Sequence, residues 1–182
     1  MRELKLAMYV SLDGVVENPA WTTPLWNDEL SDLQAEYLFA SDTLLLGRVT
    51  YEGFAASWPA MEESTGEFGV KMNTMPKFVA SNTLEQAEWN ASIIKGDLAT
   101  EVTKLKKQPG QDLLIYGSGD LVDQLTNLGL IDEYRLMLYP IIVGSGKRIF
   151  NGGTERALRL VDSRTTETGV AVLTYVGTES AA

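Results

Sequence analysis

The fold of this chain is decided by a strand-to-helix turn, Leu113-Leu114-Ile115-Tyr116-Gly117-Ser118-Gly119-Asp120-Leu121, and by a second one, Leu44-Leu45-Leu46-Gly47-Arg48-Val49-Thr50-Tyr51. In each stretch an apolar strand leads through glycine into a helix. The first N–H groups of such a helix have no partner within it, and its N-terminus carries a partial positive charge, so it attracts a phosphate. Two turns of this kind predict a dinucleotide site.

The spacing of apolar residues predicts alternating strands and helices and then two antiparallel strands. The expected strands cover residues 4–12, 43–46, 77–80, 92–95, 112–116, 133–139, 157–165 and 170–176. The expected helices cover residues 27–40, 48–57, 98–107 and 121–128. Pro59 is expected to end the second helix, and the polar stretch 62–75 stays unassigned. This order predicts an α/β fold: a central, mostly parallel sheet with an antiparallel C-terminal edge hairpin and helices on both faces.

Length and composition limit the classes of protein and of function. The 182 residues predict a single domain, 1–182. A net charge of −10 without a basic stripe disfavours binding to nucleic acid. The chain has neither His nor Cys, so the commonest metal ligands and the commonest general base are missing, and no metal site is expected.

The start of the chain is a short amphipathic run with Arg2, Glu3 and Lys5. It lacks the apolar core and cleavage site of a signal peptide, and no other stretch approaches the length of a membrane span. We therefore expect a cytoplasmic protein without membrane contact.

Each glycine motif has a purely structural interpretation as well as a functional one. Gly117-Ser118-Gly119 lacks the third glycine of a dinucleotide fingerprint, because Val122 stands there, and a tight turn alone would also require glycine. Arg48 either holds a phosphate or is a surface residue. The run 144–148 is not a phosphate-binding P-loop, because the leading glycine and the magnesium-binding hydroxyl are missing.

Taken in order and spacing, the motifs resemble the dihydrofolate-reductase-like superfamily, and most closely the branch that contains the C-terminal reductase domain of the bifunctional deaminase-reductase of riboflavin biosynthesis. The resemblance covers nearly the whole chain. Its residues are Ser11-Leu12-Asp13-Gly14, Leu46-Gly47-Arg48-Val49-Thr50-Tyr51, Val79-Ala80-Ser81, Ile115-Tyr116-Gly117-Ser118-Gly119 and Pro140-Ile141-Ile142-Val143-Gly144-Ser145-Gly146 with Phe150.

This resemblance implies the three-layer fold of the superfamily and a reduced nicotinamide cofactor, NADPH, with NADH as the other possibility. The pyrophosphate would lie between the two glycine turns, and the Gly117-Ser118 peptide bond would be cis. The cofactor-binding residues it implies are Gly47, Arg48, Thr50, Ser81, Asn82, Gly117, Ser118, Gly119, Asp120 and Leu121.

Two positions depart from the dihydrofolate reductase pattern. On a helical wheel, Asp28, Asp32 and Glu36 fall opposite the apolar face of their helix, and Ser31 stands near the acidic position of the superfamily, so dihydrofolate itself is not expected as substrate. Asp120 stands where a basic residue often lies near the 2′-phosphate, which leaves the choice between NADP and NAD open.

The remaining candidates concern the substrate. Asp13 is a candidate catalytic residue beside the nicotinamide, or else the first residue of an Asp-Gly turn. Aromatic side chains either line a planar substrate site or pack in the core. The candidate substrate residues are Trp21, Trp26, Tyr51, Trp58 and Lys147.

These observations predict an NAD(P)H-dependent reductase that transfers hydride to a small planar heterocyclic or sugar-derived substrate. It would be similar to 5-amino-6-(5-phosphoribosylamino)uracil reductase or to dihydrofolate reductase. The alternative is a nucleotide-binding protein of the same fold without catalysis. A homodimer is expected from the family, and the late antiparallel strands would supply a paired edge.

Overall fold

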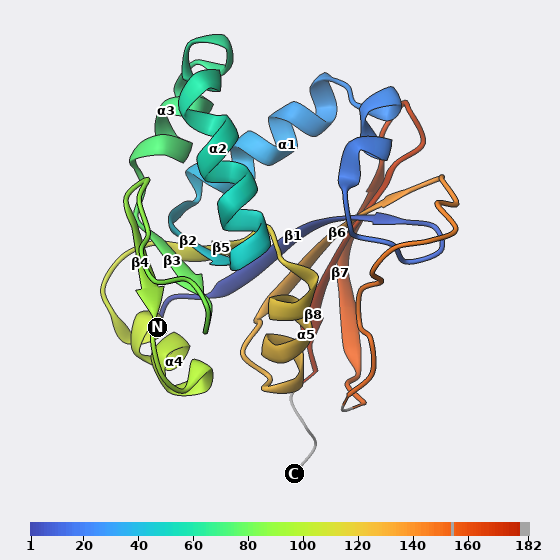
Figure 1. Cartoon of the computed structure of the whole chain (residues 1–182). Helices are drawn as coiled ribbons and strands as arrows, with labels where there is room; N and C mark the ends of the chain where they lie inside the picture. The colour runs from blue at the N-terminus through green and yellow to red at the C-terminus, as the bar shows by residue number, and fades with distance from the viewer. Residues whose placement is uncertain (154, 179–182) are drawn as a thin grey trace.

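The computed structural model describes residues 1–153 and 155–178 (Figure 1). Within them lies one eight-stranded sheet with the order β4-β3-β2-β5-β1-β6-β8-β7. The strands are β1 (Leu4–Ser11), β2 (Ser41–Gly47), β3 (Lys77–Ala80), β4 (Ala91–Ile94), β5 (Asp112–Ile115), β6 (Glu133–Tyr139), β7 (Leu158–Thr165) and β8 (Ala171–Gly177). The strands from β4 to β6 in this order run parallel, whereas β8 pairs antiparallel with β6 and β7 antiparallel with β8. The predicted α/β fold with its antiparallel edge hairpin is confirmed.

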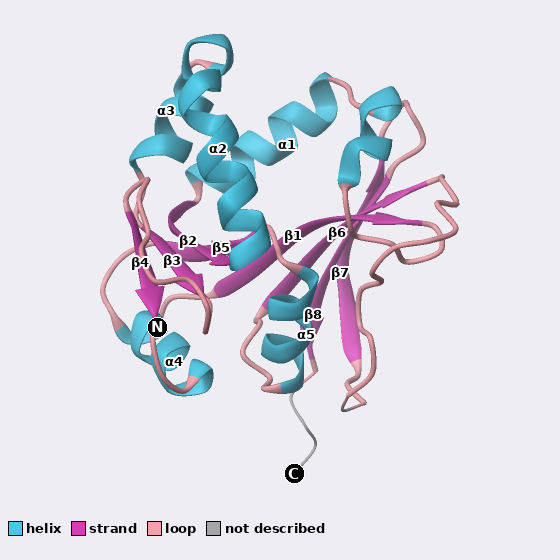
Figure 2. Cartoon of the chain, in the orientation of Figure 1, coloured by secondary structure: helices cyan, strands magenta, loops and turns pink. Residues whose placement is uncertain are grey.

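Helices cover both faces of the sheet and make the fold three-layered (Figures 1 and 2). One face carries α1 (Asp28–Phe39), α2 (Arg48–Thr65) and α3 (Glu67–Thr74). The other carries α4 (Leu98–Lys107) and α5 (Gly119–Asn127). A short 3₁₀ helix, η1 (Pro19–Leu25), precedes α1.

Side-chain caps begin two of these helices. The Asn27 side chain accepts a hydrogen bond from the N–H of Leu30 at 3.1 Å at the start of α1, and Asp97 accepts one from Thr100 at 2.8 Å at the start of α4. Such caps satisfy backbone donors that have no partner inside the helix. Both helices begin where the sequence predicts.

Two hydrophobic cores lie on the two faces of the sheet. Strand β2 supplies both, because Leu44 and Leu46 pack with α1 to α3, whereas Leu45 packs with α4 and α5. Successive side chains of a strand point to opposite faces, so a strand covered on both sides is apolar along its whole length. The apolar runs of the two glycine motifs follow from this position at the centre of the sheet.

The structure corrects two expectations about residues 48–75. Helix α2 does not end at Pro59 but continues to Thr65, and the unassigned stretch forms the end of α2 and α3. Pro59 is exposed, so water can satisfy the carbonyl that lacks its N–H. Asn73 of α3 donates to the carbonyl oxygen of Trp58 at 3.3 Å and to Glu62 Oε2 at 2.6 Å, and so fastens the second half of α2.

The fold brings the two glycine turns together at one edge of the sheet. Strands β2 and β5 are parallel neighbours with Leu45 opposite Ile115, so their carboxyl ends coincide. Ligand sites of open parallel sheets lie at this edge. The part of the chain that the structure describes contains no helix long and apolar enough to cross a bilayer.

Candidate active site

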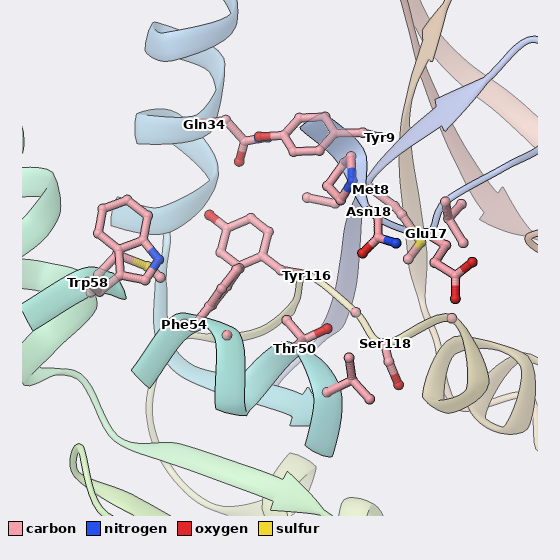
Figure 3. A pocket seen from close by; sticks show the side chains of 18 of the residues that line it. Met8, Tyr9, Glu17, Asn18, Gln34, Thr50, Phe54, Trp58, Tyr116 and Ser118 are labelled. Carbon is pink, nitrogen blue, oxygen red and sulfur yellow. The ribbon is translucent and has the colours of Figure 1, made fainter. Parts of the chain in front are cut away.

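A cavity of about 830 Å³ opens at the carboxyl ends of the central strands (Figure 3). It extends from the Gly117 turn, between the first turns of α2 and α5, to an aromatic region beneath α1. Its walls come from β1, α1, α2 and α3, the segment 16–19 and the turn 116–120. An elongated ligand therefore fits better than a compact one.

The glycine end of the cavity presents free backbone donors. The Gly117-Ser118 peptide bond is cis, as the resemblance implies. Gly47 precedes α2 and Ser118 precedes α5, and neither helix has a side-chain cap, in contrast to α1 and α4. Two uncapped N-termini with their partial positive charges meet here, which suits an anion with two phosphates.

Close packing requires both glycines. A Cβ atom on Gly47 would lie 2.2 Å from Ser118 Oγ, and one on Gly117 would lie 2.8 Å from Thr50 Oγ1. Gly117 also has a φ of 142°, a conformation that other residues rarely adopt. The glycines thus allow the two turns to touch.

An ion pair flanks the glycine end. Lys147 Nζ lies 2.7 Å from Asp120 Oδ2, and this contact raises the pKa of Lys147. The loop that carries Lys147 is joined to the end of β1 by backbone hydrogen bonds from Val16 to Lys147 and from Ile149 to Gly14, both 2.9 Å long. The one lysine in the described cavity lining therefore lies at the glycine end.

Aromatic rings line the opposite end of the cavity. Phe54 and Trp58 of α2 meet edge to face with centroids 6.4 Å apart, and Phe54 meets Tyr116 at 6.1 Å. Tyr9 of β1 lies against Trp26 at 5.9 Å. Figure 3 shows the rings of Tyr9, Phe54, Trp58 and Tyr116 around a common space. Gln34 reaches into that space from α1. Burial raises the pKa of Tyr9 and of Tyr116 well above 10, so both hydroxyls stay protonated at neutral pH.

The structure brings half of the predicted site residues into one lining. They come from both glycine turns, from the aromatic candidates and from the late loop. They are Trp26, Thr50, Trp58, Gly117, Ser118, Gly119, Asp120 and Lys147. The other eight predicted residues do not line the cavity.

Five of these belong to the surroundings of the glycine turns. Gly47 packs against Ser118, and Leu121 of α5 is buried in the core. Arg48 is exposed and pairs with Glu52 at 2.9 Å. Ser81 follows β3, whose last residue Ala80 lies opposite Gly47, so Ser81 and its neighbour Asn82 lie beside the first turn.

Asp13 does not reach the cavity. Its carboxylate accepts hydrogen bonds from Ser11 Oγ at 2.6 Å and from the N–H groups of Val143 at 3.0 Å and Gly144 at 2.8 Å. These bonds, the Ser11 hydroxyl first, hold the pKa of Asp13 far below its usual value. Asp13 thus lies in the turn before Gly14, and its carboxylate joins that turn to the loop after β6.

Two aromatic candidates are likewise turned into the protein. The Tyr51 hydroxyl donates to the carbonyl oxygen of Glu88 at 3.2 Å and accepts from its N–H at 2.8 Å. Trp21 packs edge to face on Tyr139 at 5.6 Å. Both rings pack against the protein interior, which is the alternative to a substrate role for the aromatic candidates.

The acidic residues of α1 are exposed, as the helical wheel predicts. Asp32 nevertheless reaches the rim of the cavity together with Ser31, whereas Asp28 and Glu36 do not line it. The cavity rim therefore includes part of the exposed face of α1.

Sequence reasoning missed several polar residues in the cavity, among them Tyr9, Gln34 and Tyr116. Two signals were available. Gln34 follows the buried Leu30 by one helical turn and is a polar residue on an apolar face. Tyr116 directly precedes Gly117 and therefore lies at the carboxyl end of β5, where ligands bind.

The fold is that of the dihydrofolate-reductase-like proteins. Within it, the chain belongs to the family of the RibD C-terminal domain, whose family model matches residues 2–172. It is 32% identical over 178 residues to the uncharacterised protein YyaP of Bacillus subtilis (strain 168), covering 96% of this chain and 94% of YyaP.

Two solved structures show the same fold. One is a putative riboflavin biosynthesis protein from Shewanella sp. PV-4, with a TM-score of 0.80 and 21% identity, covering 98% of this chain and all of that one. The other is dihydrofolate reductase from Enterococcus faecalis complexed with NADP(H), with a TM-score of 0.68 and 16% identity, covering 97% of each chain.

Proposed function

We propose that this protein is a nicotinamide-dependent reductase that binds NADPH, or NADH in its place, and reduces a small planar heterocyclic or sugar-derived substrate. The observation that carries the proposal is the cavity itself, which joins two uncapped helix N-termini at one end to an aromatic region at the other. Membership of the RibD C-terminal domain family supports a reductase of the riboflavin-pathway type.

The residues at the glycine end fit the cofactor's phosphates. The N–H groups of the first turns of α2 and α5 would hold the pyrophosphate, and the Thr50 hydroxyl, which faces Gly117, would donate to it. Arg48 would leave Glu52 to pair with a phosphate, and Ser81 and Asn82 would approach the adenosine ribose. The bound cofactor supplies a hydride.

The protein contributes position and exclusion of water at the aromatic end. Phe54, Trp58 and Trp26 offer flat apolar surfaces to a planar ring. Because the chain has neither His nor Cys, we propose that the accompanying proton comes from water or from a hydroxyl of the substrate.

Binding of the cofactor is the direct test. Purified protein is titrated with NADPH and NADH, with thermal stability and cofactor fluorescence as readouts. We expect stabilisation by at least one, and a loss of ~10- to 100-fold in affinity for Thr50→Val, as for one hydrogen bond to a charged group. Thr74→Val, an exposed threonine of α3, is the matched control. No stabilisation by either nucleotide would overturn the proposal.

Turnover separates a reductase from a nucleotide-binding protein without catalysis. Reduced cofactor is mixed with protein and a panel of pterins, pyrimidines and iminosugars, and its absorbance is followed. Oxidation that depends on both protein and substrate supports the reductase. Binding of the cofactor without oxidation across the panel would favour the second function.

We further propose that the protein forms a homodimer through the C-terminal hairpin. Strand β7 is the last strand of the sheet and is exposed along nearly its whole length. It includes two large apolar residues, Leu160 and Val161, which are 48% and 44% exposed. Such an edge invites pairing. Sedimentation of the wild type and of Leu160→Lys tests this: a dimer that the variant converts to monomer supports it, and a monomeric wild type contradicts it.

A further inference from the structure

The hydroxyl of Tyr116 is buried and has no hydrogen-bond partner among the described residues. Leaving a buried hydroxyl unpaired is costly, and most such groups in folded proteins are paired. The Tyr139 hydroxyl is in the same condition, but only Tyr116 lines the cavity. Its unused donor is therefore the one that a ligand in the cavity can satisfy.

The surroundings of this hydroxyl are flat and apolar. Phe54 contacts the Tyr116 ring from α2, and Trp58 and Met72 continue the wall. Figure 3 shows the Tyr116 ring standing between Phe54 and Gln34, with Tyr9 beyond. Polar groups here are two phenols and one amide, and burial keeps both phenols in the protonated, donating form. Groups of this kind recognise carbonyl oxygens and ring nitrogens.

Charge at this end of the cavity is unfavourable for an anion. Of the described lining residues only Lys147 is basic, and it lies at the glycine end in contact with Asp120. Two of the three acidic lining residues, Glu17 and Asp120, contact Lys147 at the glycine end, and the third, Asp32, lies on α1. A phosphate beside Tyr116 would meet no cation among the described lining residues and would lose its water.

We propose that the aromatic end of the cavity accepts an uncharged planar ring without a phosphate group, and that the Tyr116 hydroxyl donates a hydrogen bond to an acceptor atom of that ring. This inference rests on the proposed reductase function and names the substrate class of the same site. It distinguishes this protein from a reductase of phosphoribosyl compounds.

Matched fluorescent ring pairs test the proposal: riboflavin with its 5′-phosphate, and 6-hydroxymethylpterin with its monophosphate. Each is titrated into the full-length protein in the presence and absence of NADPH. We expect at least one ring to bind, with its phosphorylated partner at least ~10-fold weaker. The substrate class is overturned if the phosphorylated partner binds as tightly, or if no ring binds.

Tyr116→Phe tests the hydrogen bond. We expect the affinity for the ring to fall ~5- to 10-fold, while the free protein is no less stable, because the variant removes an unpaired hydroxyl. Tyr139→Phe removes the other unpaired hydroxyl, outside the cavity, and is expected to leave ring affinity unchanged. Equal ring affinity in wild type and Tyr116→Phe would overturn the role of Tyr116. If Tyr116→Phe does not fold, Tyr116→Met decides.

The cofactor titration keeps the two proposals apart. NADPH affinity is measured on every variant, and we expect Tyr116→Phe to retain it, since the phosphates bind at the other end of the cavity. Binding of NADPH without discrimination between the ring pairs would overturn the substrate class alone. Absence of NADPH binding in the wild type would instead overturn the reductase proposal.

Discussion

The N–H of Gly47 donates a hydrogen bond of 3.0 Å to the carbonyl oxygen of Gly117. This bond joins the ends of β2 and β5, two strands that are neighbours in the sheet although 70 residues separate the two glycines. It fixes the distance between the N-termini of α2 and α5. The geometry of the proposed phosphate site therefore depends on this hydrogen bond.

Gly47→Ala is expected to disturb the contact. The new Cβ would lie 2.8 Å from the backbone nitrogen of Ser118, so the two turns must separate. We expect a loss of ~1–3 kcal/mol in the free energy of unfolding and weaker NADPH binding. Gly53→Ala, inside α2 with no atom within 4 Å of its Cβ, is the control for stability and should be neutral or stabilising. Chemical denaturation measures both.

Arg48 and Glu52 predict opposite effects on cofactor affinity. Their ion pair is 2.9 Å long and half exposed, so it is weak and easily exchanged for a phosphate. Arg48→Ala should lower NADPH affinity by ~3- to 10-fold. Glu52→Gln, which frees Arg48, should leave that affinity equal or higher. A larger loss for NADPH than for NADH would place the guanidinium at the 2′-phosphate, and equal affinity of Arg48→Ala and wild type would exclude it from the site.

Asp13 makes stability sensitive to acid. The pKa of Asp13 is depressed in the folded protein. The contribution of Asp13 to stability is therefore complete above the ordinary pKa of an aspartate, near 4, and declines as the pH falls below that value. Asp13→Asn should destabilise the protein at pH 7, and the difference from wild type should shrink towards pH 2. Glu36→Gln, an exposed carboxylate, is the control. A difference that stays constant between pH 7 and 2 would contradict this role.

Lys77 predicts a gain of stability at alkaline pH. Its ammonium is buried, donates to the carbonyl oxygen of Met75 at 2.7 Å and lies 4.1 Å from the centroid of Trp89. Burial lowers the pKa of Lys77 to about 8. Between pH 8 and 10 the unfolded chain binds this proton and the folded chain does not, so stability rises with pH.

The measurement for Lys77 compares wild type with Lys77→Met between pH 7.5 and 10. Wild type should gain on the order of 1–3 kcal/mol relative to the variant. Lys104→Met, at an exposed lysine of α4, should show a constant difference. A constant difference for Lys77→Met as well would show that Lys77 titrates alike in both states.

Local signals predicted most elements of the fold. The caps Asn27 and Asp97 and the apolar runs of β2 and β5 are each visible in a few consecutive residues. The failure in residues 48–75 has a tertiary cause, because α3 packs on α2 at Gly69, where a Cβ would lie 2.8 Å from the Cα of Glu62. No rule based on neighbours in the sequence reports that contact.

The candidate site divides in the same way. The glycine turn at Gly117 was predictable, since its strand, turn and helix are contiguous. Arg48 and Asp13 show the limit of this reasoning, although both belong to motifs that border the cavity. The Arg48 side chain pairs with Glu52. The Asp13 side chain accepts hydrogen bonds from the loop after β6. The direction of a side chain depends on partners that sequence distance does not reveal.

The sequence by itself determined the α/β order, the two glycine turns and the lack of His and Cys, because these are local or compositional properties. Tertiary structure alone decided that Tyr9, Gln34 and Tyr116, from three different elements, share one cavity. Parallel pairing sets the carboxyl ends of distant strands side by side, and packing of α1 on the sheet closes the space above them. Contacts of that range arise only when the whole chain folds.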